Sequence, residues 1–412
     1  MELKPGYKQT EVGVIPEDWE VKDVGRISSL KNGYSFKSNS YNPLGKYKII
    51  TISNVQDGYF YTEECNKIAT IPTDLQPHQE LTIGDILISM TGNVGRVCIV
   101  NEINCLLNQR VGKLIPNSDI NSSFFYHLLR TSRFRATLIE NAKGGAQGNL
   151  NIEDIYSFSF SLSPLVSEQS AIATVLSDTD SLIESLEQLI AKKRLIKQGA
   201  MQELLTGKRR LPGFAQKSGY KQTEVGVIPE DWETKNLGDI SEIVMGQSPS
   251  SLNYNSKGEG LPLIQGMADI SDRKTIKRIF TREISKLGKV GDILMSVRAP
   301  VGEIAKTMFD VCLGRGVCAI RHPTEFLYHY LISQEQKWKK ISKGSTFDSI
   351  NSDDVKELII VFPSNSNERE AIATVLSDMD EEITSLEDKL SKLRQIKLGM
   401  MQELLTGRIR LV

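Results

Sequence analysis

The chain has 412 residues, of which 40% are hydrophobic and 25% charged, and its formal net charge is −1. This length exceeds one ordinary core and indicates two or three domains, while the balanced charge excludes a uniformly basic nucleic-acid binder but not a basic patch on one face. No stretch approaches the roughly 18 apolar residues of a membrane span, and the first residues lack the apolar segment of a signal peptide, so we expect a cytoplasmic protein without membrane contacts.

The chain opens with the box GYKQTEVGVIPEDWE at residues 6–20, which returns unchanged at residues 219–233. After the first box, short apolar runs bounded by Gly, Asn and Pro predict strands. These runs are KYKIITI (46–52), GDILIS (84–89), GRVCIV (95–100) and CLLNQRVGKLI (105–115). The stretch FYHLLRTSRFRATL (125–138) predicts helix. Residues 1–163 are therefore predicted to form a first mixed α/β domain.

Residues 164–211 predict one long helix. Its apolar residues recur every three or four positions, at Ile172, Val175, Thr179, Leu182, Leu186, Leu189, Ile196 and Ala200. Such spacing over about four heptads predicts coiled-coil packing. Gly207 stands where the C-terminus of a helix favours glycine.

The second half repeats this plan. Strands are predicted in LPLIQGM (261–267), GDILMSV (291–297), VCLGRGVCAI (311–320) and ELIIVF (357–362), and a helix in YHYLISQEQKWKKI (328–341). Residues 212–363 thus predict a second mixed α/β domain, and residues 364–412 a second long helix. Its predicted seam is Ile372, Val375, Met379, Ile383, Leu386, Leu390, Leu393, Ile396 and Met400. Residues 171–211 and 371–411 agree at 27 of 41 positions, whereas the blocks before them have diverged.

The repeat indicates a duplicated unit rather than a solenoid, because its period is far too long for a solenoid. We expect an α/β (α+β) fold with two duplicated mixed domains separated by two long helices that are conserved between the halves. The simplest partner for each helical seam is the other copy, which gives an antiparallel coiled coil with pseudo-two-fold symmetry. The alternative is homodimerisation through the same seams.

Sequence motifs for catalysis are missing. The chain contains no GxxxxGK[ST] loop, no GxGxxG after a strand and no (Asn/Asp)-Pro-Pro-aromatic loop. The five cysteines include no CxxC pair, which argues against zinc and a disulfide framework. Cys105 and Cys312 are predicted to be equivalent and buried, and His127 and His329 to be structural. We therefore expect no catalytic residue, no metal site and no cofactor in this chain.

The order of these motifs resembles the specificity (S) subunit of type I restriction–modification enzymes over essentially the whole chain. The resemblance rests on TEVGVIPEDWE opening each half, GDIL followed by VG, KGGAQGNLNI and KGSTFDSI before the long helices, and QELLTG closing each half. It implies that each divergent block is a target recognition domain and that the helices are spacers between two half-sites of double-stranded DNA.

The same resemblance implies partners and cofactors. Two methyltransferase (M) subunits would dock on the helices and the nearby surface and carry S-adenosylmethionine. Restriction (R) subunits would add translocation and cleavage that depend on ATP and Mg²⁺. The repeated box is then interpreted as one docking surface presented twice, with recombination between the copies as the alternative cause of its identity.

Candidates for DNA contacts are polar side chains in glycine-bounded loops next to strands. In the first domain these are Asn93, Gln109, Arg110, Lys143, Gln147 and Asn149. In the second domain these are Gln247, Arg298, Arg315, Lys343, Ser345 and Thr346. The alternative for each is a turn residue that makes only a local hydrogen bond.

Basic clusters at residues 192–197, 208–210, 272–278 and 337–343 are either DNA-facing patches or solvated faces. Two rival functions stay open at this point. One is a coiled-coil scaffold that joins proteins without contacting DNA, and the other is the DNA reader of another type of restriction–modification system.

Overall fold

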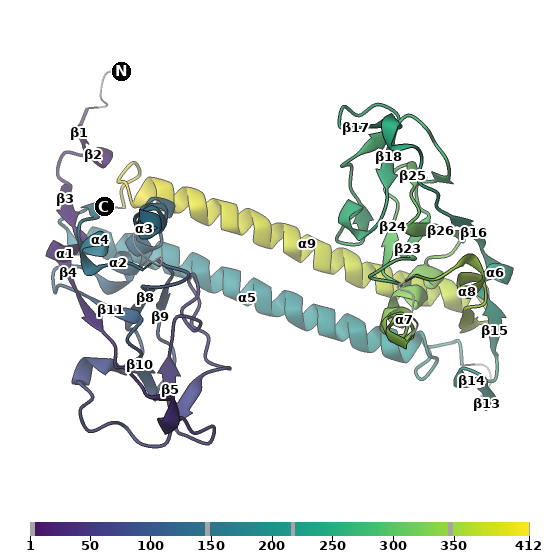
Figure 1. The fold of residues 1–412 in the computed structure, drawn as a ribbon, viewed down its shortest axis with the longest axis horizontal. Coiled ribbons are helices and arrows are strands. Elements are labelled where there is room, and N and C mark those ends of the chain that lie inside the picture. The colour runs from purple at the N-terminus through teal and green to yellow at the C-terminus, as the bar shows by residue number, and fades with distance from the viewer. Residues whose placement is uncertain (1–4, 145–148, 216–218, 345–348, 412) are drawn as a thin grey trace. The chain divides into compact units, whose positions relative to one another are not determined.

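The computed structural model describes residues 5–144, 149–215, 219–344 and 349–411 (Figure 1). The chain divides into two compact units, of which the first holds residues 1–187 and 389–412 and the second holds residues 188–388. Each unit thus contains one divergent block and a part of each long helix.

The first unit is built on two small four-stranded sheets, in the orders β4-β11-β8-β9 and β6-β5-β10-β7. The strands are β4 (Ser28–Asn32), β5 (Tyr47–Ile50), β6 (Asn66–Ile68), β7 (Glu80–Leu81), β8 (Ile86–Ser89), β9 (Val97–Ile99), β10 (Cys105–Leu107) and β11 (Val111–Pro116). The repeated box forms a hairpin of β1 (Tyr7–Thr10) and β2 (Gly13–Pro16). Strand β3 (Glu20–Asp23) then pairs with β12 (Ser159–Leu162), which joins the start of the block to its end.

The helices of the first unit cover the β4–β11–β8–β9 sheet with a shared core that includes Phe124, Phe125 and Phe134. They are α1 (Val24–Ile27), α2 (Ser122–Leu129), α3 (Ser132–Gly144), α4 (Ile152–Tyr156) and the first part of α5 (Val166–Leu204). The predicted helix at 125–138 is therefore two helices, which meet at the non-helical Arg130. The Asn121 side chain caps the first of them by accepting a hydrogen bond from the Phe124 amide.

The second unit repeats this plan with longer sheets, in the orders β16-β26-β23-β24-β20-β19 and β17-β21-β18-β25-β22. The strands are β16 (Glu242–Met245), β17 (Tyr254–Asn255), β18 (Leu261–Ile264), β19 (Ile270–Ser271), β20 (Lys274–Thr275), β21 (Phe280–Thr281), β22 (Leu287–Gly288), β23 (Ile293–Ser296), β24 (Ile304–Lys306), β25 (Val311–Leu313) and β26 (Val317–Arg321). The second box forms the hairpin β13 (Tyr220–Thr223) and β14 (Gly226–Pro229), and β15 (Trp232–Asn236) pairs with β27 (Ile359–Pro363). Its helices are α6 (Leu237–Ile240), α7 (Glu325–Gly344), α8 (Ser352–Lys356) and part of α9 (Ser366–Leu404).

The two long helices have 39 residues each, and their buried positions differ by one residue from much of the predicted seam. Four of the predicted seam residues in α5 are exposed instead: Val175 (37%), Leu182 (47%), Leu189 (37%) and Ile196 (47%). The inward side chains include their neighbours Leu176 and Ile190. Apolar residues occupy both of the adjacent positions in several turns, so apolarity alone does not distinguish them. In α9 the predicted seam residue Ile396 is likewise exposed, and its neighbour Lys397 is buried.

Polar side chains of α5 and α9 pair in opposite chain order within each unit. In the first unit Asp180 pairs with Lys397, and Glu187 with Arg394. In the second unit the cations are on α5, where Lys193, Arg194 and Lys197 pair with Glu382, Glu387 and Asp380. Three cations of the basic cluster at 192–197 therefore bind the neighbouring helix.

One ion-pair cluster fastens the opening box in each unit. In the first unit Arg410 donates to both Asp18 and Glu168 and lies over the fully buried Trp19 ring, 5.7 Å from its centroid. Trp19 also donates its indole N–H to Glu168, whose residue is 1% exposed. Burial raises the pKa of Glu168, but hydrogen bonds from Arg410, Ser163 and Trp19 outweigh this and hold it below the usual value.

The second unit builds the same cluster from Arg210, Asp231, Glu368 and Trp232. Each cluster thus joins a box, the first turn of the following helix and the segment after the other copy's helix. Gly207 and Gly407 lie between these parts with φ of +69° and +71°, the left-handed conformation that glycine adopts at the end of a helix, as predicted for Gly207. A Cβ at Gly407 would lie 2.6 Å from the Pro16 ring of the box, and one at Gly207 2.5 Å from Pro229, so only glycine fits.

His127 and His329 are buried at equivalent places, which agrees with their predicted structural role. Nε2 of His127 lies 3.1 Å from Ser177 Oγ on α5, and Nε2 of His329 lies 3.0 Å from Ser377 Oγ on α9. Burial disfavours the charged imidazole and lowers the pKa of His127 to about 3 and that of His329 to about 4.

The predicted burial of Cys105 and Cys312 is confirmed, but their equivalence is wrong by one residue. In parallel pairing, Leu107 lies opposite Ile50 at the end of β10, as Leu313 lies opposite Ile264 at the end of β25. Counting back, Cys105 corresponds to Val311, so the two cysteines occupy opposite faces of their strands.

Replacing Arg410 by Met should destabilise the first unit by about 3–5 kcal/mol, because the buried Glu168 carboxylate would lose its cation. Urea unfolding at neutral pH measures this change. Arg408→Met is the matched control, since the Arg408 side chain is 63% exposed and its ion pair is with the exposed Glu403. Equal effects of the two substitutions would contradict the role given to the cluster.

The stability of the first unit should fall as the pH drops below about 6.5, because the unfolded chain then protonates His127 whereas the folded chain does not. At pH 5 this costs about 2 kcal/mol for each such histidine. His127→Gln should reduce the difference in unfolding free energy between pH 7.5 and pH 5 by that amount. An unchanged pH dependence in His127→Gln would be the opposing result.

Candidate nucleic-acid interface

Two turns with equivalent backbones carry the candidate DNA-contacting residues at residues 108–110 and 314–316. In the first unit the Asn108 amide donates to Ile50 O and the Met90 amide to Arg110 O. In the second unit the Gly314 amide donates to Ile264 O and the Val297 amide to Gly316 O. Gln109 and Arg315 therefore occupy the same position in the divergent blocks of the two units (residues 1–163 and 212–363, each called a module below), and both are exposed.

A second pair of loops lies beside these turns, between β8 and β9 and between β23 and β24. Thr91 bridges to Asn149 in the first unit, and Arg298 bridges to Ser349 in the second. The next residues repeat the correspondence, because the Leu150 amide donates to Met90 O and the Ile350 amide to Val297 O. The sheet thereby brings together segments that are 58 residues apart in the first module and 51 residues apart in the second.

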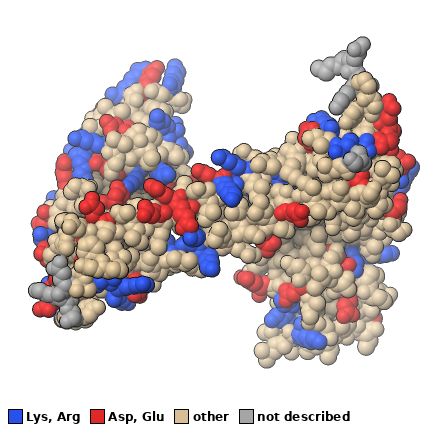
Figure 2. All heavy atoms as spheres, turned by 180° about the vertical axis from the view of Figure 1, so that it is seen from behind, with Lys and Arg blue, Asp and Glu red and all other residues tan. Residues whose placement is uncertain are grey.

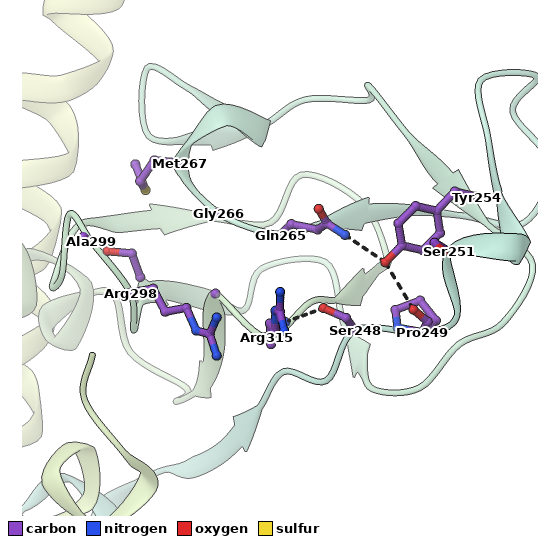
Figure 3. Close-up of a pocket in the computed structure, with 12 residues that line it drawn as sticks. Ser248, Pro249, Ser251, Tyr254, Gln265, Gly266, Met267, Arg298, Ala299 and Arg315 are labelled. Atoms are coloured by element: carbon purple, nitrogen blue, oxygen red, sulfur yellow. Dashed lines mark hydrogen bonds between the residues drawn. The ribbon is translucent and has the colours of Figure 1, made fainter. Parts of the chain in front are cut away.

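In the second unit these loops border a hollow of about 430 Å³. Its lining residues are Ser248, Pro249, Ser251, Tyr254, Gln265, Gly266, Met267, Ser296, Arg298, Ala299, Arg315 and Gly316. Figure 3 shows the Arg298 side chain extending in the direction of Arg315, and Gln265 donating to the Tyr254 hydroxyl at 2.9 Å. The hollow thus combines two cations with neutral hydrogen-bonding groups, a mixture that suits the edges and phosphates of nucleic acid.

In the first unit a hollow of about 370 Å³ lies beside the β8–β9 loop and is lined by Gly92, Asn93, Val94, Arg135, Ile139, Ala142 and Lys143. Arg135 is paired with Asp57. Two of the predicted residues, Asn93 and Lys143, therefore meet in one place. The exposed Gln109, Arg110 and Asn149 lie outside the residues that line this hollow.

The residues predicted in the second module do not all lie together. Arg298 and Arg315 share the hollow, whereas Gln247 is exposed next to it and its amide donates to Leu313 O. Lys343 falls in α7. The predictions at Gln147, Ser345 and Thr346 lie outside the described residues.

Ser248, Tyr254 and Gln265 also line the hollow of the second unit, but no sequence pattern predicted them. Tyr254 and Gln265 lie close together because β17 and β18 both pair with β21, and no local sequence pattern predicts this pairing. Gly246 could have indicated this site from the sequence, because it corresponds to Gly33 and precedes the polar residues that include Ser248. A Cβ there would lie 2.1 Å from Gly314 O, so glycine marks the place where these two segments touch.

Charge is interspersed rather than gathered on the face shown in Figure 2, where Lys and Arg alternate with Asp and Glu. Within the basic cluster at 272–278, Arg273 pairs with Glu335 and Arg278 with Asp269. These two cations are therefore part of the fold.

Within the described part of the chain, no three His, Cys, Asp or Glu side chains are grouped as metal ligands. Over the same residues, no helix combines the length and the apolarity needed to cross a membrane.

Comparison with known proteins identifies the family. Residues 16–192 and 229–395 each match the family described as the type I restriction modification DNA specificity domain. The chain is 32% identical to a putative type I restriction enzyme MjaX specificity subunit of Methanocaldococcus jannaschii, over 98% of this chain and 96% of the relative. It is 26% identical to the type I restriction enzyme EcoBI specificity subunit of Escherichia coli, over 88% and 79% of the two chains.

Solved structures agree on the fold. The crystal structure of a type I restriction–modification S subunit from M. genitalium superposes with a TM-score of 0.63 at 17% identity, covering 98% of both chains. A chain from a structure that describes assembly of a type I system gives a TM-score of 0.54 at 21% identity, over 96% and 99% of the chains. The two matched segments and the nearly full-length relative together show that this chain belongs to the family of type I restriction–modification specificity subunits.

Proposed function

We propose that this chain reads a bipartite, asymmetric DNA site, with one half-site for each module. The observation that carries this proposal is the pair of equivalent turns that present different side chains, Gln109 in one module and Arg315 in the other. Side-chain amides and guanidinium groups favour different base edges in the major groove. Two like frames with unlike contact residues therefore suit a site with two unlike halves.

The long helices act in this proposal as a spacer, packed as an antiparallel coiled coil with pseudo-two-fold symmetry. Support comes from the ion pairs within each unit, which connect α5 to α9 in opposite chain order. Further support comes from Leu176, Ile190 and Leu204, buried at intervals of fourteen residues, which is two heptads.

The chemistry belongs, in this proposal, to partner subunits. Two methyltransferase subunits dock on the helices and nearby surface with S-adenosylmethionine, and restriction subunits bring ATP and Mg²⁺. The chain itself contributes recognition without catalysis, and works in the cytoplasm where its DNA is. The names of the relatives, which are specificity subunits of type I restriction enzymes, support this division.

Modified-base sequencing of host DNA tests the proposal directly. With the gene intact, one bipartite adenine-methylated motif should be present, and disruption of the gene should remove that motif alone. A methylation pattern that does not change on disruption would contradict the proposed function and favour a scaffold role. Restoring the gene on a plasmid controls for effects of the disruption on neighbouring genes.

Lengthening both helices by one heptad should widen the gap between the half-sites without changing them. The insertion repeats residues 186–192 in α5 and residues 386–392 in α9, so that the buried positions keep their seven-residue period. Seven residues add about 10 Å of helix, which corresponds to about three base pairs. The same sequencing reports the new motif.

The matched control lengthens α5 alone, which shifts its lysines away from the carboxylates of α9 and should abolish methylation. An unchanged gap with both helices lengthened would remove the spacer role.

A further inference from the structure

Two arginines of the second module share one hollow and face no carboxylate of the described residues. Six arginines lie between residues 219 and 335, and four of them form ion pairs: Arg273 with Glu335, Arg278 with Asp269, Arg282 with Glu259, and Arg321 with Glu242 and Asp292. The two others are Arg298 and Arg315, which both line the 430 Å³ hollow. Two guanidinium groups that line one hollow, with no carboxylate partner among the described residues, favour a ligand rich in hydrogen-bond acceptors.

The backbone holds Arg315 more firmly than an exposed loop would. Its amide donates to Ser248 Oγ at 3.2 Å, and the turn is closed by the Val317 amide donating to Gly314 O at 3.2 Å. Both flanking positions are packed against the end of β18, because a Cβ at Gly316 would lie 2.0 Å from Gln265 O. Arg315 thus projects from a fixed point between two strands, which gives the positional accuracy that base reading needs.

Arg298 is held differently. It lies in the β23–β24 loop beside the exposed Ala299 and Pro300, and its backbone bridges to Ser349. A long cation on such a loop suits a phosphate, which accepts hydrogen bonds from many directions and carries no sequence information.

We infer that Arg315 selects a guanine in the half-site of the second module and that Arg298 contacts a phosphate next to it. Guanidinium donates two parallel hydrogen bonds that match O6 and N7 of guanine in the major groove. This inference rests on the proposed function, since it names the base that the second module reads.

Gln109 in the equivalent turn of the first module gives the counterpart. A glutamine amide donates to N7 and accepts from the N6 amino group of adenine, so the first module reads adenine at the matching step. The backbone N–H of Gln109 donates to Tyr34 O at 3.0 Å, and the Tyr34 hydroxyl donates to Asp74. This turn is therefore also anchored to the segment that contains Tyr34. The Gln109 side chain is exposed and available to a base.

The test replaces the gene by variants in its host and sequences modified bases. Arg315→Gln should reduce the preference for G·C at one position of one half-site by about tenfold or more, in favour of A·T, while the other half-site keeps its sequence. Gln109→Arg should change one adenine of the other half-site toward guanine. Arg282→Ala, at an exposed arginine of the same module, should leave the motif as it is.

Arg298→Ala separates base reading from phosphate binding. The purified complex of this chain with its methyltransferase subunits should bind duplexes carrying each of the four bases at the guanine position with uniformly lower affinity, and with a salt dependence reduced by about one phosphate contact. If Arg315→Gln abolishes methylation in the host, binding of the purified variant complex to the same four duplexes measures its base preference instead.

Equal weakening of all four duplexes by Arg315→Gln would overturn the inference, as would a wild-type motif without a G·C pair in either half-site. In both cases a motif that depends on this gene would still support the proposed function. Loss of the proposed function itself is recognised by the absence of any such motif in the wild type.

Discussion

The contact on which each unit depends is the buried ion pair between an arginine that follows one long helix and a glutamate in the first turn of the other. Arg410 with Glu168, and Arg210 with Glu368, close this contact over the rings of Trp19 and Trp232. Each cluster takes its parts from both copies of the repeat. A change in one box therefore affects a surface made by the other copy's tail, which supplies a structural reason for the identity of the boxes besides partner docking and recombination.

The diverged blocks obey a different constraint, because equivalent backbone hydrogen bonds position their turns in both units. Gly314 and Asn108 donate to equivalent carbonyls although their side chains differ, and the exposed residue after each is free to vary. Where the backbone approach is closest, only glycine fits, as at Gly316. The frame of a module is thus independent of the residue that it presents, so two unlike modules can be built on one plan.

Sequence patterns predicted the duplication, most strands and the long helices, because these depend on local periodicity and on self-comparison. They failed where two adjacent residues meet the same criterion. Val175 and Leu176 are both apolar, and only packing into the core of the first unit selects Leu176. Cys105 and Cys312 share a residue type, but strand pairing makes Cys105 equivalent to Val311. The hollow at Arg298 and Arg315 was only half found, since Tyr254 and Gln265 reach it through pairing with β21.

The buried ion-pair clusters and the exposed turn residues contribute very different free energies to folding, and this difference determines which residues can change. Exposed turn residues such as Gln109 contribute within about 0.5 kcal/mol to folding, whereas breaking a buried pair such as Arg410 with Glu168 costs several kcal/mol. Substitutions at these exposed turn positions are therefore nearly neutral for stability, and those that alter the scaffold are not. Divergence confined to the blocks, with boxes and tails held nearly identical, is the pattern that this difference in free energy produces.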